Sequence, residues 1–216
     1  MINKVVTLEE ALSFIQDGQR IMVGGFLNVG APLKLLEAIY EKGTKDLTVI
    51  SNDTSFVDKG VGKLLANNQI KKVIGSYIGS NPETGKRMND GRLEVELVPQ
   101  GTFAERIRCG GAGLGGFLTP TGVGTIVEEG KEILEVNGKK YLLELPLKAD
   151  IALIKAYKAD TFGNLVYRGT ARNFNPLMAM AADLVIVEAE EIVEVGALNP
   201  EEIVTPGIFV DKIIQG

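Results

Sequence analysis

The chain has 216 residues and a net charge of -5 at neutral pH, with no basic run, which argues against a nucleic-acid-binding protein. Apolar residues make up 45% and charged residues 24%, as in soluble globular proteins, so we expect one domain over residues 1–216 with a sizeable core. No apolar run could span a bilayer, and the N-terminal residues lack the features of a signal peptide. A single cysteine, Cys109, excludes an internal disulfide, so we expect a cytoplasmic protein without a membrane partner.

The chain has no histidine, which excludes several catalytic designs within it. Ser-His-Asp and Cys-His catalysis are ruled out, as are histidine-ligated zinc sites, and we expect no metal. Any chemistry must use carboxylates, amides, hydroxyls, lysine or backbone N–H groups. Since no histidine can activate Cys109, we expect its thiol to be a small buried apolar group.

Strand and helix patterns alternate along the first half of the chain. A capping box at Thr7-Leu-Glu-Glu10 predicts a helix that ends at Asp17-Gly18. The elements that follow are strands at 21–23, 47–50, 72–78 and 93–98 and a helix at 33–40 that ends before Gly43. This order predicts an α/β fold, with an open, largely parallel sheet and flanking helices.

The second half adds a hairpin and two more buried strands. Thr102 and Glu105 form a second capping box, which predicts another helix after Pro99. Asn137-Gly138 between the runs 131–136 and 139–145 predicts a β-hairpin with a type I′ turn. The remaining elements are strands at 151–156 and 184–187, a helix that begins at Asn173-Phe-Asn-Pro176, and an N-cap at Asn199.

The stretch from Asp17 to Pro32 joins a strand, a glycine loop and a helix start. Gly24 and Gly25 follow the strand directly, and Pro32 suits the first turn of the next helix. This order predicts free N–H groups around one small volume, suited to a phosphate, a carboxylate or a developing oxyanion. The alternative is that the glycines only form the turn of an α/β crossover.

A second glycine-rich stretch, residues 110–116, satisfies the dinucleotide pattern G-x-G-x-x-G through Gly111, Gly113 and Gly116. The pattern should follow a strand and open a helix, whereas here it follows a predicted helix. A mobile or closely approached loop fits these glycines better. A nucleotide-dependent oxidoreductase remains the alternative function on this evidence.

Four segments resemble one known family: residues 17–32, Pro99-Gln-Gly-Thr102, Gly110-Gly-Ala-Gly113 and Thr119-Pro-Thr-Gly-Val-Gly-Thr125. Together they resemble the alpha chain of family I CoA-transferases, of the acetate or butyrate:acetoacetate type. The resemblance runs from Asp17 to about Pro206. Pro32-Leu33-Lys34 departs from the Pro-Glu-Asn of some succinyl-CoA:3-oxoacid relatives, which favours short-chain acids such as acetate or butyrate.

The resemblance implies a ping-pong transfer of CoA between carboxylic acids. A glutamate attacks the acyl-CoA thioester and then becomes a glutamyl-CoA thioester, so CoA is a substrate and no cofactor is permanently bound. In this family the glutamate lies on a homologous beta subunit, in a Ser-Glu-Asn-Gly motif that this chain lacks. The resemblance therefore implies an α2β2 assembly. Glu188, at the end of a predicted strand, is the most tempting glutamate here, but a solvated carboxylate is the plainer interpretation.

The resemblance also assigns roles to particular residues of this chain. Asn52 corresponds to an amide donor of the oxyanion hole, and Gln100 to a glutamine that lines the acyl pocket. Each has a plainer alternative role as a loop cap. A non-catalytic binding subunit or a purely structural subunit is the remaining alternative for the whole chain. The loop expected to bind CoA consists of Gly24, Gly25, Phe26, Leu27, Asn28, Val29 and Gly30.

Overall fold

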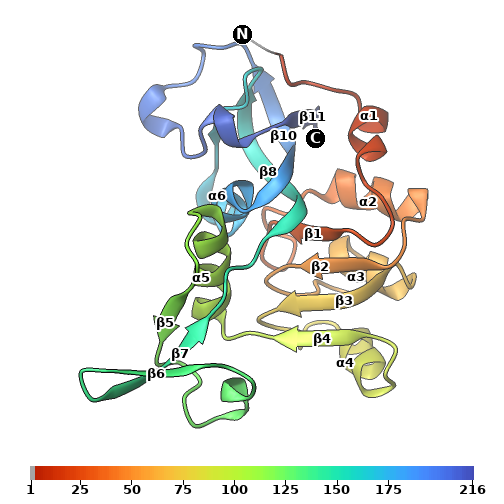
Figure 1. Cartoon of the computed structure of the whole chain (residues 1–216). Coiled ribbons are helices and arrows are strands. Elements are labelled where there is room, and N and C mark those ends of the chain that lie inside the picture. Colours follow the sequence, from red (N-terminus) through yellow and green to blue (C-terminus); the bar gives the residue numbers. More distant parts are fainter. Residues whose placement is uncertain (1–2) are drawn as a thin grey trace.

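The computed structural model describes residues 3–216 and contains one large sheet and one small sheet (Figure 1). The α-helices are α1 (Leu8–Ser13), α2 (Leu33–Lys42), α3 (Gly60–Ala66), α4 (Pro82–Asn89), α5 (Gln100–Gly111) and α6 (Asn175–Met180). The strands are β1 (Arg20–Val23), β2 (Leu47–Ile50), β3 (Ile70–Gly75), β4 (Glu94–Leu97), β5 (Phe117–Thr119), β6 (Ile133–Val136), β7 (Lys139–Glu144), β8 (Ala149–Asp160), β9 (Leu165–Val166), β10 (Ala182–Val193) and β11 (Lys212–Gln215).

The large sheet has the strand order β11-β10-β8-β1-β2-β3-β4, and every neighbouring pair along this path is parallel. Only the short β9 adds to it antiparallel, against β8. The predicted open, largely parallel α/β sheet is confirmed. Because the strands are parallel, the loops after β1, β2, β3 and β4 all leave the same edge of the sheet, where ligands bind in open α/β folds.

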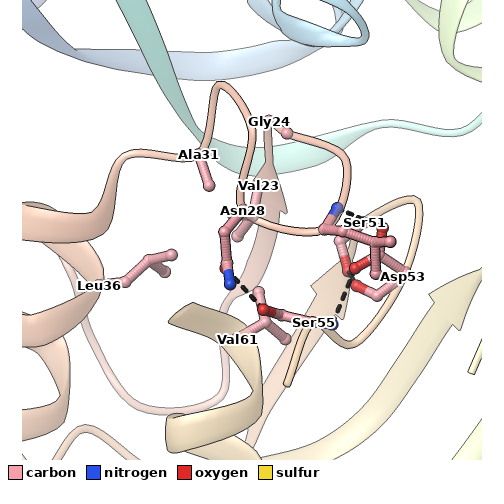
Figure 2. A pocket seen from close by; sticks show the side chains of 11 residues that line it. Val23, Gly24, Asn28, Ala31, Leu36, Ser51, Asp53, Ser55 and Val61 are labelled. Carbon is pink, nitrogen blue, oxygen red and sulfur yellow. Dashed lines mark hydrogen bonds between the residues drawn. The ribbon is translucent and has the colours of Figure 1, made fainter. Parts of the chain in front are cut away.

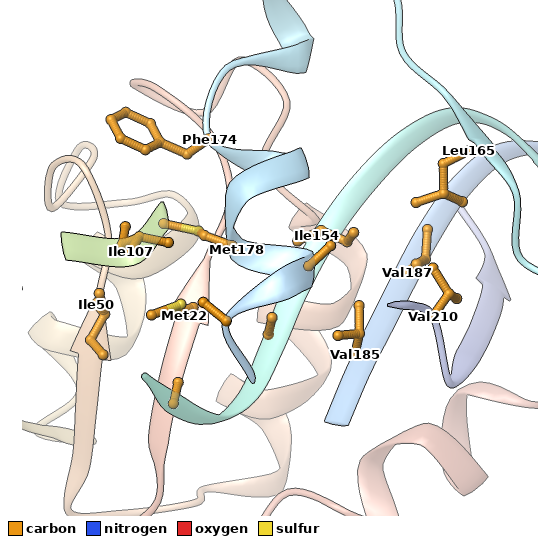
Figure 3. Close-up of a cluster of buried hydrophobic side chains, with 14 of the residues drawn as sticks. Met22, Ile50, Ile107, Ile154, Leu165, Phe174, Met178, Val185, Val187 and Val210 are labelled. Atoms are coloured by element: carbon orange, nitrogen blue, oxygen red, sulfur yellow. The ribbon is translucent and has the colours of Figure 1, made fainter. Parts of the chain in front are cut away.

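Helices cover both faces of the large sheet, and the strand residues alternate between the two cores. Met22 in β1 packs in the core formed with α5 and α6, together with Ile107 and Met178 (Figure 3). Ile21 and Val23 point the other way, into the core formed with α1, α2 and α3. The alternation shows that β1 is buried on both faces of the sheet.

The small sheet, with the order β5-β7-β6, extends from the main body beside α5 (Figure 1). Its hairpin has the predicted type I′ turn, with φ of 52° at Asn137 and 75° at Gly138. Arg106 of α5 holds it to the main body by donating from Nε to the Leu145 carbonyl oxygen at 3.0 Å. The predicted hairpin extension is therefore confirmed, with β5 as an additional strand.

Several predicted element boundaries were wrong. Helix α1 ends at Ser13 and not at Asp17, and β8 and β10 each span 12 residues, far beyond the predicted 151–156 and 184–187. The capping box at Thr102 was also wrong. Because Pro99 takes the N-cap position and α5 begins at Gln100, Thr102 lies inside the first turn, and its buried Oγ1 has no hydrogen-bond partner among residues 3–216.

Among the described residues, no helix is both long and apolar enough to cross a membrane.

Candidate active site

The loop after β1 closes on itself through a tight turn. Gly24 N donates to the Leu153 carbonyl oxygen of β8 at 3.0 Å, which continues the sheet by one residue. Phe26 and Val29 then exchange two backbone hydrogen bonds of 3.0 and 2.9 Å. Leu27 and Asn28, between them, both have positive φ values, 46° and 71°. Such a turn projects its two flanking side chains outward, and Phe26 and Val29 are 42% and 50% exposed.

Asp53, in the loop after β2, fastens this turn to the neighbouring strand (Figure 2). Its Oδ2 accepts a hydrogen bond from Leu27 N at 3.0 Å, and its Oδ1 accepts one from Ser55 N at 2.8 Å. The Ser55 hydroxyl adds a 2.5 Å hydrogen bond to Asn28 Oδ1. The loops after β1 and β2 therefore form one hydrogen-bonded unit. No sequence motif marks Asp53 for this role.

The volume enclosed by these two loops is too small for a substrate group. The cavity between the loop glycines, Asp53 and Ser55 measures about 10 Å³, room for about one water molecule. Most N–H groups of the loop are used inside the protein, since buried amides must find partners. An anion site at this loop therefore stays a prediction. Within residues 3–216, only the Asn28 and Gly30 amides of the loop lack an acceptor.

The start of α2 is not open to an anion either, because Glu188 of β10 caps it. Glu188 Oε2 accepts hydrogen bonds from Lys34 N at 2.9 Å and Leu35 N at 3.1 Å, and the residue is 3% exposed. Burial raises the pKa of Glu188, although the two amides and the Lys155 ammonium group oppose the shift. The interpretation of Glu188 as a solvated strand-end carboxylate was wrong. β10 continues past it, so its side chain is buried between the sheet and α2.

Asn52 lies next to this unit, at the carboxyl end of β2. It is 1% exposed, its Nδ2 donates to Asp53 Oδ2 at 3.0 Å, and its Oδ1 accepts from the Ser76 hydroxyl at 2.9 Å. One hydrogen of the Nδ2 group is used by Asp53, and no hydrogen bond within residues 3–216 uses the other. The side chain is held rigidly beside the glycine loop.

Gln100 lies farther along the same edge, at the start of α5 after β4. It is exposed and makes no side-chain hydrogen bond within residues 3–216. Since β3 separates β2 from β4, the strand ends that lead to Asn52 and Gln100 are two strand spacings apart, roughly 10 Å. The structure thus joins Asn52 to the glycine loop and leaves Gln100 at the far side of the edge.

The segments 99–102 and 119–125 meet in space, although a helix separates them in sequence. The first turn of α5 faces β5 across a groove of about 430 Å³. The groove is lined by Gly101, Thr102, Glu105, Phe117, Leu118, Thr119 and Thr121.

The second glycine stretch has no dinucleotide geometry. Gly110 and Gly111 belong to the last turn of α5, so the pattern follows a helix. A Cβ on Gly110 would lie 2.4 Å from the Leu147 carbonyl oxygen, which explains this glycine by close approach. Cys109, just before it, is fully buried, as predicted.

No group of three potential metal ligands occurs among residues 3–216.

The sequence profile of the coenzyme A transferase family matches residues 5–216. The chain is 60% identical to the alpha subunit of an acetate CoA-transferase of Escherichia coli K12, over 99% of this chain and 97% of the relative. It is 54% identical to one subunit of a succinyl-CoA:3-ketoacid coenzyme A transferase of Helicobacter pylori J99, over 100% of this chain and 93% of the relative.

The fold is that of a solved acyl-CoA transferase of Escherichia coli O157:H7, determined as a thioester complex with CoA. The TM-score is 0.88 at 21% identity, over 99% of this chain. This chain spans about half of that protein, 47% of its length. The profile matches nearly the whole chain, and the 60% identity extends over 97% of the acetate CoA-transferase subunit. These two findings show that the chain belongs to the coenzyme A transferase family.

Proposed function

We propose that this chain is the alpha subunit of a CoA-transferase that moves CoA between a short-chain acyl-CoA and acetate or a 3-oxoacid. The reaction follows a ping-pong route through a glutamyl-CoA thioester. The nucleophilic glutamate comes from a homologous beta subunit, in an α2β2 assembly. The 60% identity to the alpha subunit of an acetate CoA-transferase supports both the substrate class and the role of this chain in the assembly.

One structural observation supports the assignment of the nucleophilic glutamate to the beta subunit. The carboxylates beside the glycine loop, Asp53 and Glu188, are both buried and both bound to backbone amides of this chain. A carboxylate nucleophile must reach the thioester carbon, whereas these two are fixed as loop and helix caps. In this proposal the chain therefore supplies binding surface and hydrogen-bond donors, and the nucleophilic carboxylate comes from the beta subunit.

In this proposal the loop of residues 24–30 contacts CoA. Phe26 and Val29 present exposed apolar surface, and the amide of the half-buried Asn28 remains for a ligand acceptor. Gly24, Gly25 and Gly30 are buried and act by shaping the loop. The loop thus combines an apolar contact with backbone donors, a combination typical of small-molecule sites.

Asn52 and Gln100 complete the part of the site that this chain supplies. Asn52 supplies an amide hydrogen that stabilises the oxyanion formed when the thioester is attacked, and Gln100 lines the acyl pocket. Neither amide titrates near neutral pH, so both serve the same role across the working range. Removal of one oxyanion donor typically lowers kcat by roughly 10²- to 10³-fold.

The test is to trap the covalent intermediate. The chain is co-expressed with the product of the neighbouring gene, the complex is incubated with acetoacetyl-CoA, and the thioester is reduced with borohydride. Mass spectrometry should find the modified glutamate on the partner polypeptide. A modified glutamate in this chain, or normal CoA exchange by this chain alone, would overturn the proposal. The Glu188→Gln complex is the control and should still form the adduct.

Acceptor specificity is tested in the same complex. Acetate, butyrate and succinate are compared by kcat/KM with acetoacetyl-CoA as donor. We expect acetate and butyrate to be used better than succinate. Preference for succinate would contradict the proposed substrate class without affecting the assignment of this chain as the alpha subunit.

A further inference from the structure

Two asparagines from a distant part of the chain hold the loop of residues 24–30 in place. Asn173 Oδ1 accepts a hydrogen bond from Gly25 N at 3.1 Å, and Asn173 Nδ2 donates to the Val29 carbonyl oxygen at 2.8 Å. One side chain therefore bridges the two ends of the turn. Its amide supplies an acceptor and a donor on two separate atoms, whereas a carboxylate has no donor and a hydroxyl has only one polar atom.

Asn175 is the deeper of the two, with no exposed surface. Its Nδ2 donates to the carbonyl oxygens of Gly30 at 3.0 Å and Ala171 at 2.9 Å, and its Oδ1 accepts from Lys155 N of β8 at 3.1 Å. The side chain thus links the end of the loop to the strand beside β1. Its polar atoms are fully used, as burial requires.

The same segment explains why two residues of the loop are glycines. A Cβ on Gly24 would lie 1.8 Å from Asn175 Oδ1, and a Cβ on Gly30 would lie 2.2 Å from the Ala171 carbonyl oxygen. The first clash is with a side chain that could be removed, and the second is with backbone. The glycines leave the space that residues 171–175 fill.

We propose that Asn173 and Asn175 are positioning residues of the transferase reaction: they hold the glycine loop in the shape in which it meets CoA. The inference rests on the proposed function, because that function places CoA on the loop. Neither asparagine needs to touch CoA. Loss of either side chain should weaken binding of the CoA portion and leave the carboxylate acceptor site intact.

Amide hydrogen exchange tests whether the asparagines hold the loop, and it needs no measurement of enzyme activity. In the assembled complex, Asn173→Ala should speed amide exchange in peptides covering residues 24–31 at least tenfold, because Gly25 N loses its acceptor. Asn164→Ala is the matched control, since Asn164 is also half-buried, accepts from Gly207 N and donates to Asp160. It should leave residues 24–31 unchanged. Unaltered loop exchange in Asn173→Ala would overturn the proposal.

A double variant tests the contact at Gly24 directly. Gly24 does not have a positive φ, so an alanine there meets only the steric problem. Gly24→Ala should lower Tm strongly in the wild-type background and much less in Asn175→Ala, where the clashing oxygen is gone. Equal losses of Tm in both backgrounds would overturn the assigned contact.

Steady-state kinetics test the functional half. The KM for acyl-CoA should rise about tenfold in Asn173→Ala, while the KM for the carboxylate acceptor stays within twofold and Asn164→Ala matches wild type. A general loss of structure would affect both constants. Faster loop exchange with an unchanged KM for acyl-CoA would overturn the link to CoA. A wild-type complex without transferase activity would instead refute the proposed function, and the exchange result would still decide whether the asparagines hold the loop.

Discussion

Glu188 in β10 and Leu35 in α2 are joined by a hydrogen bond of 3.1 Å from the Leu35 amide to the Glu188 carboxylate. The same oxygen accepts from Lys34 N, so one buried acid satisfies two orphan amides at the start of the helix. The carboxylate also complements the positive end of the helix dipole. An acid in the middle of a strand thus performs the task usually left to a residue at the helix start.

The burial of Glu188 makes stability depend on pH in a defined direction. Burial raises the folded-state pKa of Glu188 above its ordinary value, so its contribution to stability is fully present below the unfolded pKa. The contribution is lost as pH rises through the folded pKa. We expect Glu188→Gln, which cannot ionise, to lack this loss. Urea unfolding from pH 4 to pH 7 should show the stability of wild type falling relative to the variant, and a constant difference would contradict the assignment.

Gly30→Ala should be strongly destabilising, because Gly30 has a φ of 73° and its Cβ would lie 2.2 Å from the Ala171 carbonyl oxygen. Gly43 is the matched control, with the same φ of 73° and no atom within 4 Å of its Cβ position. The positive φ alone costs about 1–2 kcal/mol. We expect Gly43→Ala to lose about that much in thermal unfolding and Gly30→Ala clearly more. Equal losses would show that the clash is relieved by movement of residues 171–175.

The proposed oxyanion role of Asn52 is tested by Asn52→Ala in the assembled complex. Turnover should fall roughly 100-fold or more, the effect of losing one oxyanion donor. Ser76→Ala is the control, because Ser76 donates to Asn52 Oδ1 and leaves its Nδ2 donor in place. Most turnover should remain in that variant. Full activity in Asn52→Ala would remove its assigned role.

Gln100→Ala separates function from stability more cleanly, since Gln100 is exposed and unbonded within residues 3–216. Its stability should stay within about 0.5 kcal/mol of wild type, as for most surface substitutions. Turnover should nevertheless fall. An unchanged kcat/KM for every acyl donor would refute a place for Gln100 in the acyl pocket.

The small sheet contains a buried carboxylate, Glu144, which is 2% exposed and pairs with Lys131 at 2.5 Å. Lys131→Met should destabilise the chain by about 3 kcal/mol, because it leaves a buried carboxylate with only the Arg106 guanidinium at 3.9 Å. Adding Glu144→Gln removes the charge and should recover part of the loss. Thermal unfolding measures both variants, and the absence of recovery would show that Lys131 acts through packing.

The sequence predicted most of the fold because local signals and the sheet pattern agree. The apolar run at residues 47–50 is β2, and Gly43 ends α2 with a φ of 73°. The lengths of β8 and β10 were underestimated because charged residues interrupt their apolar runs. In the structure those charges pair across the two strands, as Lys158 does with Glu191 at 2.8 Å, so the ladder continues.

The site was predicted less completely, since its contacts are far apart in sequence. The glycine loop and Asn52 are adjacent because they follow neighbouring parallel strands, but the partners of the loop are Asp53 and Asn173. Gly25 and Asn173 are separated by 148 positions, and no local pattern marks such a pair. The sequence did contain one indication of these contacts. Asn173 and Asn175 place two side-chain amides at the start of a predicted helix.

The anchoring of the glycine loop has a consequence for affinity. A ligand that folds its own binding loop gives up part of its binding energy to order that segment. Here the amides of residues 24–27 are already satisfied by the protein before any thioester arrives. The entropy of ordering the loop is therefore lost when the chain folds, so in the proposed function the acyl-CoA donor meets a preorganised surface.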